Sequence, residues 1–144
     1  MKTKEFFSRI DHDRMVAAIA AAEKHTSGQI RVYVSHRNVL DARHAAMQHF
    51  LKLGMTRTKE RNAVLIFVAP ESQRYYLVGD EGIHAKCGDE FWQQVSARMG
   101  EHFKKGEFTE GIVHGVEAAG KLLAQHFPPH GPGNHQSPNA VVEG

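Results

Sequence analysis

The chain has 144 residues, eleven histidines, one cysteine (Cys87) and a formal net charge of +2. This length suits one domain with its own hydrophobic core and no disulfide, and the scattered Lys and Arg residues argue against nucleic-acid binding. Residues 1–14 lack the apolar core of a signal peptide and no segment has the roughly 18 apolar residues of a membrane span, so we expect a cytoplasmic protein.

The first predicted elements are a helix and a strand. Asp11 is a preferred N-cap residue type and Gly28 supplies a stop, so we expect a helix between them. Its apolar stripe, at helical spacing, consists of Met15, Ile19 and Ala22. Residues 29–35 then alternate between apolar and polar side chains, which predicts a strand.

A second helix and a hairpin follow. The helix is predicted from Asp41 to Gly54. Residues 63–69 are apolar throughout, which is typical of a strand covered on both faces, whereas residues 74–79 mix polar and apolar side chains. The polar link over 70–73 makes these two strands an antiparallel hairpin. The preceding strand, helix and strand form a right-handed βαβ unit with parallel strands, so the sheet is mixed.

The remaining elements are two helices and a tail. Residues 83–87 are expected to form a short turn, after which Asp89 caps a helix that ends at Gly106. The last helix is predicted over residues 109–125. Residues 128–144 are rich in Pro and Gly and poor in apolar side chains, so we expect a disordered tail.

These elements predict an α/β fold for a domain over residues 1–127. The architecture is a three-layer α/β/α sandwich whose mixed central sheet, built from the βαβ unit and the hairpin, is flanked by helices. The hairpin places Arg61 beside Asp80, and the parallel first strand brings Gln29 to the same end of the sheet. Segments far apart in the sequence are therefore expected to converge there.

Four carboxylates are predicted at this end of the sheet. They belong to Asp80, Glu81, Asp89 and Glu90. Carboxylate and backbone oxygens are the ligands that calcium prefers, so these residues are the candidate metal ligands. A structural interpretation stands beside this one, because Asp89 and Glu90 suit the start of a helix and Asp80 suits a turn or a pair with Arg61. The spacing of an EF-hand loop is absent.

Other motifs give weaker evidence for a functional site. His84 and Cys87 have the spacing of half a zinc site, but no second His or Cys pair follows at a matching distance. A phosphatase thiolate at Cys87 would need an arginine a few residues downstream, and residues 88–93 contain none. The sequence therefore names no catalytic residue.

Several segments together carry a family resemblance. They are SGQIRVYV (27–34), RTKERNAVLIFVA (57–69), YYLVGDEGI (75–83), a Trp-bearing helix and FKKGEFTEGIVHGV (103–116). In these segments the chain resembles the TPM domain, which occurs in a thylakoid-lumen phosphatase-like protein, a photosystem II repair protein and a modulator of an acetylcholine receptor. The resemblance runs from about Arg14 to Phe127 and implies an α/β sandwich with a mixed sheet.

The resemblance also implies several functions. Some members are described as acid phosphatases, some bind calcium through acidic residues near one sheet end, and several act in assembly or repair of membrane complexes. Carried over to this chain, Asp80 is the first residue of a cation site and Asp89 the next. Gln29 and Ala63 stand where members commonly have Glu and Gly. The carboxylate missing at Gln29 would face the Asp80 cluster, so we expect calcium binding to be weak.

Two functions remain open from the sequence. The first is a non-enzymatic binding or assembly and repair factor, a monomer with an unidentified protein partner and no cofactor beyond weakly bound calcium. The second is a metal-dependent acid phosphatase, in which a cation on the same carboxylates activates water. The sequence shows no recognisable nucleophile, and this favours the first.

Overall fold

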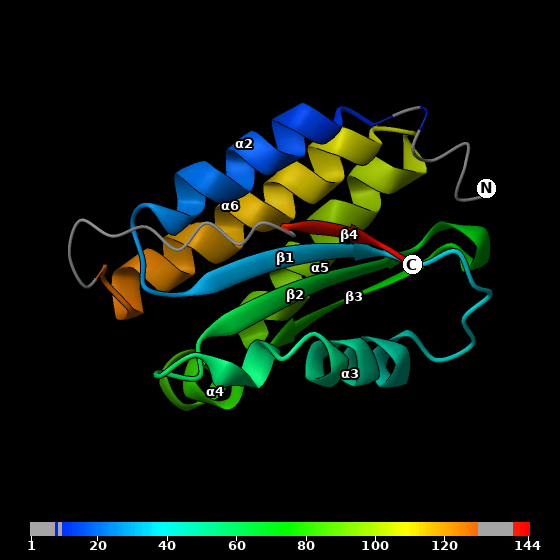
Figure 1. Cartoon of the computed structure of the whole chain (residues 1–144). Coiled ribbons are helices and arrows are strands. Elements are labelled where there is room, and N and C mark those ends of the chain that lie inside the picture. The colour runs from blue at the N-terminus through cyan, green and yellow to red at the C-terminus, as the bar shows by residue number, and fades with distance from the viewer. Residues whose placement is uncertain (1–7, 9, 130–139) are drawn as a thin grey trace.

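A mixed β-sheet with helices on both faces forms the centre of the structure, a computed structural model that describes Ser8, residues 10–129 and residues 140–144. The strands are β1 (Gln29–Val34), β2 (Ala63–Ala69), β3 (Arg74–Gly79) and β4 (Val141–Glu143). The helices are α2 (His12–Glu23), α3 (Ala42–Lys52), α4 (Glu81–Cys87), α5 (Glu90–Lys104) and α6 (Phe108–His126), with short 3-10 turns η1 (Met55–Arg57) and η2 (Pro70–Ser72). Figure 1 shows α2 and α6 on one side of the sheet and α3 on the other. The predicted three-layer α/β/α architecture is confirmed.

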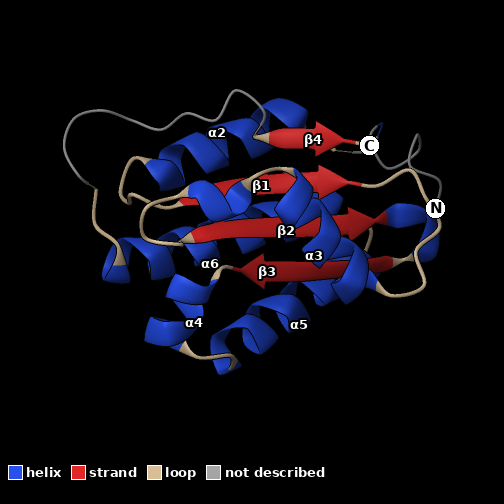
Figure 2. Ribbon diagram, turned by 60° about the horizontal axis from the view of Figure 1, so that its bottom comes forward, coloured by secondary structure: helices blue, strands red, loops and turns tan. Residues whose placement is uncertain are grey.

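The strand order is β3-β2-β1-β4 (Figure 2). The β1 and β2 strands are parallel, with Gln29 opposite Ala63, as the βαβ unit predicts. The β3 strand runs antiparallel to β2, as predicted for the hairpin. On the other side of β1 lies β4, parallel to it, with Val32 opposite Val141. The prediction of a disordered tail is therefore wrong at residues 141–143, while residues 130–139 lie outside the described part of the chain.

Alternation along the strands builds two cores. On one face, residues such as Val32 and Ile66 pack against α2, α5 and α6. On the other face, Leu65 and Phe67 pack with Phe50 of α3. All seven residues of β2 are buried, which confirms that this strand is covered on both sides. Among the described residues, no helix is long and apolar enough to cross a membrane.

A buried acid joins α2 to the sheet. Glu23 lies in the last turn of α2, is 5% exposed, and its Oε2 accepts a hydrogen bond from the Ile30 backbone N–H at 2.9 Å. Burial disfavours the charged form and raises the pKa of this carboxyl to about 7, and the Ile30 hydrogen bond opposes the shift without cancelling it. Glu23 therefore gains and loses its proton near neutral pH at the start of β1.

The segment after β3 is helical, and the predicted turn over residues 83–87 is wrong. Asp80 has extended backbone and its Oδ1 accepts from the Glu81 N–H at 2.8 Å, so it caps α4. Glu81 in the first turn and Lys86 in the last complement the helix dipole. These signals are present in the sequence, and Ile83, fully buried in the core, fixes the short helix in place.

Candidate functional site

The predicted meeting point at one end of the sheet is organised by Arg61. Its Nε donates to Asp80 Oδ2 at 2.8 Å and its Nη2 donates to Oδ1 at 3.0 Å, which makes a bidentate pair. The third contact runs from Nη1 to Glu81 Oε1 at 3.1 Å. The Asp80 side chain is only 5% exposed, and hydrogen bonding to it raises the pKa of the Arg61 guanidinium. One cation thus holds two of the four candidate carboxylates.

Close backbone packing fixes this pair. Arg61 has φ +52°, a left-handed conformation, and its carbonyl accepts the N–H of Gly82 at 3.0 Å. A Cβ at Gly82 would lie 2.1 Å from the Glu60 carbonyl oxygen, so only glycine fits at this position. The GDEGI sequence therefore serves the contact between α4 and the chain that enters β2.

Polar side chains continue the contact towards β1. The Asn62 side chain donates from Nδ2 to Ser27 Oγ at 3.0 Å, and that hydroxyl donates to Glu60 Oε1 at 3.1 Å. Asn62 is 1% exposed, and its Oδ1 has no hydrogen-bond partner in the structure. These bonds join the loop before β1 to the loop before β2, so the RN sequence has a structural role.

The remaining candidate residues lie apart from Asp80. Asp89 is 78% exposed in its side chain and lies 2.8 Å from Nδ1 of His84, and it makes no capping bond to α5. Glu90 is exposed in the first turn of α5. Gln29 turns to Arg31, whose Nε and Nη2 lie 3.3 and 3.2 Å from its amide oxygen in the orientation that satisfies both groups.

The strand register explains the position of Gln29. It lies opposite Ala63, and the Asp80 N–H donates to the Ala63 carbonyl at 3.0 Å. Two strand spacings of about 4.8 Å each therefore separate the backbones of Gln29 and Asp80. The predicted convergence on one sheet end is correct for the backbone, but the Gln29 side chain is paired with Arg31 rather than with Asp80.

The zinc-like spacing of His84 and Cys87 does not assemble a larger cluster. Over residues 10–129 and 140–144, no three His, Cys, Asp or Glu side chains converge as a metal site would require. Burial raises the pKa of the Cys87 thiol, which lowers its thiolate fraction at neutral pH.

Comparison with known proteins identifies the family to which the chain belongs. A family model of the TPM domain matches residues 1–122. The chain belongs to the TPM domain family. Among curated proteins, none matches the chain.

Two solved structures resemble this TPM domain. The NMR structure of BA42 from the psychrophilic bacterium Bizionia argentinensis is 37% identical, covers 94% of this chain and 95% of its own, and superposes with a TM-score of 0.82. The N-terminal domain of the cg2496 protein from Corynebacterium glutamicum is 15% identical over 90% of this chain and 84% of its own, with a TM-score of 0.63. The second likeness shows the shared fold alone.

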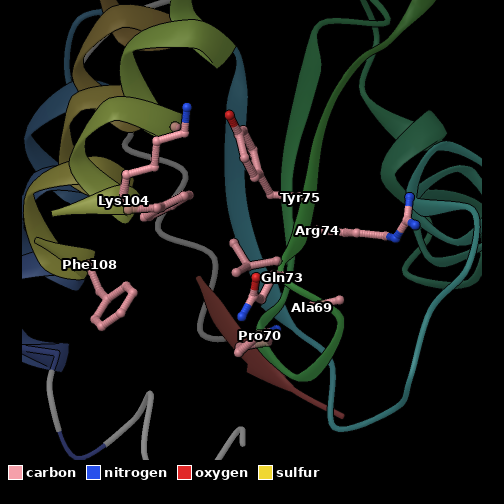
Figure 3. Close-up of a pocket in the computed structure, with 10 residues that line it drawn as sticks. Ala69, Pro70, Gln73, Arg74, Tyr75, Lys104 and Phe108 are labelled. Atoms are coloured by element: carbon pink, nitrogen blue, oxygen red, sulfur yellow. The ribbon is translucent and has the colours of Figure 1, made fainter. Parts of the chain in front are cut away.

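Two hollows lie at the opposite end of the TPM domain sheet from Arg61. One, of about 470 Å³, lies between the β2–β3 hairpin and α5 and is lined by Tyr75, Phe103 and Phe108. Figure 3 shows Arg74 pointing away from this hollow. The Tyr75 hydroxyl donates to the Ser96 carbonyl at 2.6 Å, so it is already used within the fold.

The second hollow, of about 530 Å³, lies where β1 leads into α3. Arg37, His44 and Lys52 line it together with one carboxylate, Asp41, so basic groups outnumber acidic ones in this hollow. The His49 ring, also in this lining, stacks on Tyr33 with centroids 4.1 Å apart.

Sequence reasoning missed a further feature, the outer surface of α3. Leu40, immediately before the helix, is 83% exposed, and Met47 and Leu51 within it are 46% and 63% exposed. Ala46 and Phe50 form the buried stripe of the same helix. Met47 and Leu51 are spaced four residues apart, so a second apolar stripe could have been found beside the first.

Proposed function

We propose that this TPM domain is a binding domain that recognises a protein partner through the outer surface of α3. The observation that carries the proposal is that Met47 and Leu51, one helical turn apart on α3, are both exposed, as is Leu40 in the segment before the helix. In the described part of the chain, the other exposed large apolar side chain is Val16, on the far layer, at 37%. Exposed apolar side chains that lie side by side on a folded domain indicate an interaction site, and the four-residue spacing places Met47 and Leu51 side by side.

The charge around the stripe defines the partner. The sequence of α3, ARHAAMQHFLK, contains no acidic residue, and Arg43 and Lys52 are exposed on this helix. The exposed N-cap Asp41 is the acidic residue next to Leu40, so the charge of this surface is basic on balance. Complementary charge steers association and disfavours wrong partners. The partner surface that fits is therefore an apolar groove with an acidic rim.

Substitution of the stripe tests this function. The experiment is cross-linking of the protein to its partner in native extracts. The amount of partner cross-linked to the Met47→Lys, Leu51→Lys double variant should be at least about tenfold lower than the amount cross-linked to the wild type, because two apolar contact residues become charged. Val16→Lys is the matched control and should retain that partner. Circular dichroism should show both variants folded, since the replaced side chains are exposed. Equal capture by the double variant and the wild type would contradict the proposal.

We further propose that calcium binds at most weakly at the Arg61 end of the sheet, where Asp80, Glu81, Asp89 and Glu90 do not form a ready-made cluster in the described part of the chain. The arrangement supports low affinity because a cation must compete with Arg61 for Asp80 and with His84 for Asp89.

A calcium titration followed by amide NMR measures this affinity. Shifts should develop over residues 79–90 with a Kd of about 1 mM or weaker. Glu81→Gln should weaken binding further, whereas Glu71→Gln, in η2 at the hairpin, is the control and should not. Absence of shifts over 79–90 at millimolar calcium would remove the metal proposal. If the protein hydrolyses an aryl phosphate and Glu81→Gln abolishes this activity, the protein is instead a metal-dependent phosphatase.

A further inference from the structure

The edge strand β4 is attached to the domain differently from the other strands. It has three residues, and the ten residues 130–139 separate it from the segment that follows α6. Through these ten residues β4 stays covalently joined to the domain. The pairing of β4 with β1 therefore resembles the binding of a peptide to a sheet edge, except that both strands belong to one chain.

Backbone hydrogen bonds hold β4 along one side of β1. The Val32 N–H donates to the Ala140 carbonyl at 2.8 Å, the Gly144 N–H donates to the Val34 carbonyl at 2.9 Å, and the His36 N–H donates to the Gly144 carbonyl at 2.6 Å. Nothing in these bonds depends on the side chains of residues 140–144. Another extended segment could make the same bonds, as in strand addition at a sheet edge.

Side chains add a modest selectivity. Val141 packs at the border of the core formed with α2 and α6, and Val142 packs at the border of the core formed with α3. Both are only half-buried, whereas their neighbours in β1 are buried. Glu143 forms an ion pair with Nε2 of His36, and both side chains are about half exposed. The edge therefore suits two adjacent β-branched residues followed by a carboxylate.

Removal of β4 would leave a binding groove. The N–H groups of Val32 and His36 and the carbonyl of Val34 would lose their partners, and such an open edge is a template for another strand. Gly144 also lines the basic hollow of about 530 Å³ beside α3, so the end of β4 covers part of it. An acidic, apolar strand that replaced β4 would continue into this basic hollow.

We propose that the β1 edge is a docking site for an extended segment of a partner protein, and that residues 140–144 are a tethered occupant that this segment displaces. The proposal rests on the proposed binding function, for which it supplies a second contact surface next to α3. The partner segment runs parallel to β1 and carries two adjacent β-branched residues followed by Asp or Glu. The occupant seen in the structure provides the template for this pattern.

The tether sets the strength of the competition. At an effective concentration of β4 ten times its own Kd for the β1 edge, a free strand would bind the closed form roughly tenfold more weakly than the open one. Displacement therefore requires a partner that also uses another surface, such as α3.

Amide hydrogen exchange on the full chain tests whether β4 is exchangeable. The Ser35 N–H, which donates to Val68 of β2 at 2.8 Å, is the control within the same segment as the Val32 and His36 N–H groups. Protection factors for Val32 and His36 should be at least about 100-fold lower than that for Ser35, because they are lost when β4 opens rather than when the core unfolds. Equal protection would overturn the proposal.

A peptide added in trans tests the docking site. Acetyl-Ala-Val-Val-Glu-Gly-amide should shift the β1 amides, and a peptide with Pro in place of the second Val should not. In the full chain, Val142→Pro should increase the peptide affinity about tenfold, because alternation directs the 142 N–H towards β1. Val141→Pro is the matched control, since the 141 N–H faces away from β1, and it should leave the affinity unchanged.

The outcomes separate this proposal from the proposed function. Absence of β1 shifts in the Val142→Pro variant, with its NMR spectrum otherwise native, would overturn the docking site and leave partner capture by α3 standing. Peptide binding at β1 together with unchanged capture by the Met47→Lys, Leu51→Lys variant would support the edge site and contradict the role of α3.

Discussion

Glu23→Gln should stabilise the chain at pH 8 by about 2–3 kcal/mol and leave its stability nearly unchanged at pH 4. Glu23 has a pKa of about 7 in the fold, above the ordinary value of 4.5. Between these two values the native carboxyl holds a proton that the unfolded chain releases, so the free energy of unfolding falls as pH rises and the contribution is lost above pH 7. Glutamine is neutral throughout and retains an oxygen that can accept the Ile30 N–H.

Urea unfolding of both proteins at pH 4, 6 and 8 measures the effect, because the difference between them cancels the titration of the other groups. Glu101→Gln, at an exposed position of α5, is the control for losing a surface carboxyl. A stability difference between Glu23→Gln and wild type that is the same at pH 4 and pH 8 would contradict the role assigned to Glu23.

Gly82→Ala should destabilise the fold by about 3 kcal/mol. The added methyl group would lie 2.1 Å from the Glu60 carbonyl oxygen and 2.7 Å from that of Arg61, and both are backbone atoms that cannot rotate away. The α4 helix would have to shift, which disturbs the bidentate pair between Arg61 and Asp80. Chemical denaturation gives the loss, and amide NMR should show the largest changes over residues 60–62 and 79–87.

Gly106→Ala provides a matched comparison. Gly106 has φ +77°, but a Cβ there would meet nothing within 4 Å. Its substitution should cost about 1 kcal/mol, the price of a left-handed conformation alone. A loss at Gly82 no larger than that at Gly106 would show that α4 moves freely, and that the GDEGI segment is not packed as described.

Patterns that repeat along an element predicted most of the fold. The alternation in residues 29–35 and the apolar run in 63–69 each involve seven positions; β2 spans the whole of its predicted range, and β1 ends one residue earlier, at Val34. Asp11 and Asp41 accept hydrogen bonds from backbone N–H groups of their helices, as capping residues should. Periodicity and capping residues are local features of the sequence, so they can be recognised without knowledge of the tertiary contacts.

The short elements α4 and β4 were not predicted, because each has too few residues to show a periodic pattern of apolar side chains. The α4 helix has seven residues and contains Gly82, which lowers helix propensity, and the contacts that hold it come from the 60–61 backbone and the core around Ile83. The β4 strand shows only Val141 and Val142 as apolar residues in a tail rich in Pro and Gly. Its order depends on pairing with β1, from which it is distant in the sequence.

The location of the candidate site and its pair between Arg61 and Asp80 were predicted from the sequence, but the other contacts of its charged groups were not. The topology brings Gln29, Arg61 and Asp80 to one end of the sheet, as expected. The contact of Arg61 with Glu81 and the turn of Gln29 towards Arg31 depend on side-chain directions, which cannot be read from spacing. The exposed Met47 and Leu51 were also missed, because a helix with one apolar stripe already satisfied the pattern.

The late position of β4 in the chain has a consequence during synthesis. Val32 pairs with Ile66 across about 34 residues but with Val141 across about 110. At about 5–20 residues per second, the ribosome completes β3 several seconds before it completes β4. Throughout this interval β1 lacks the partner that pairs with its outer edge in the finished fold. The edge of β1 is thus the last part of the sheet for which the chain supplies a partner strand.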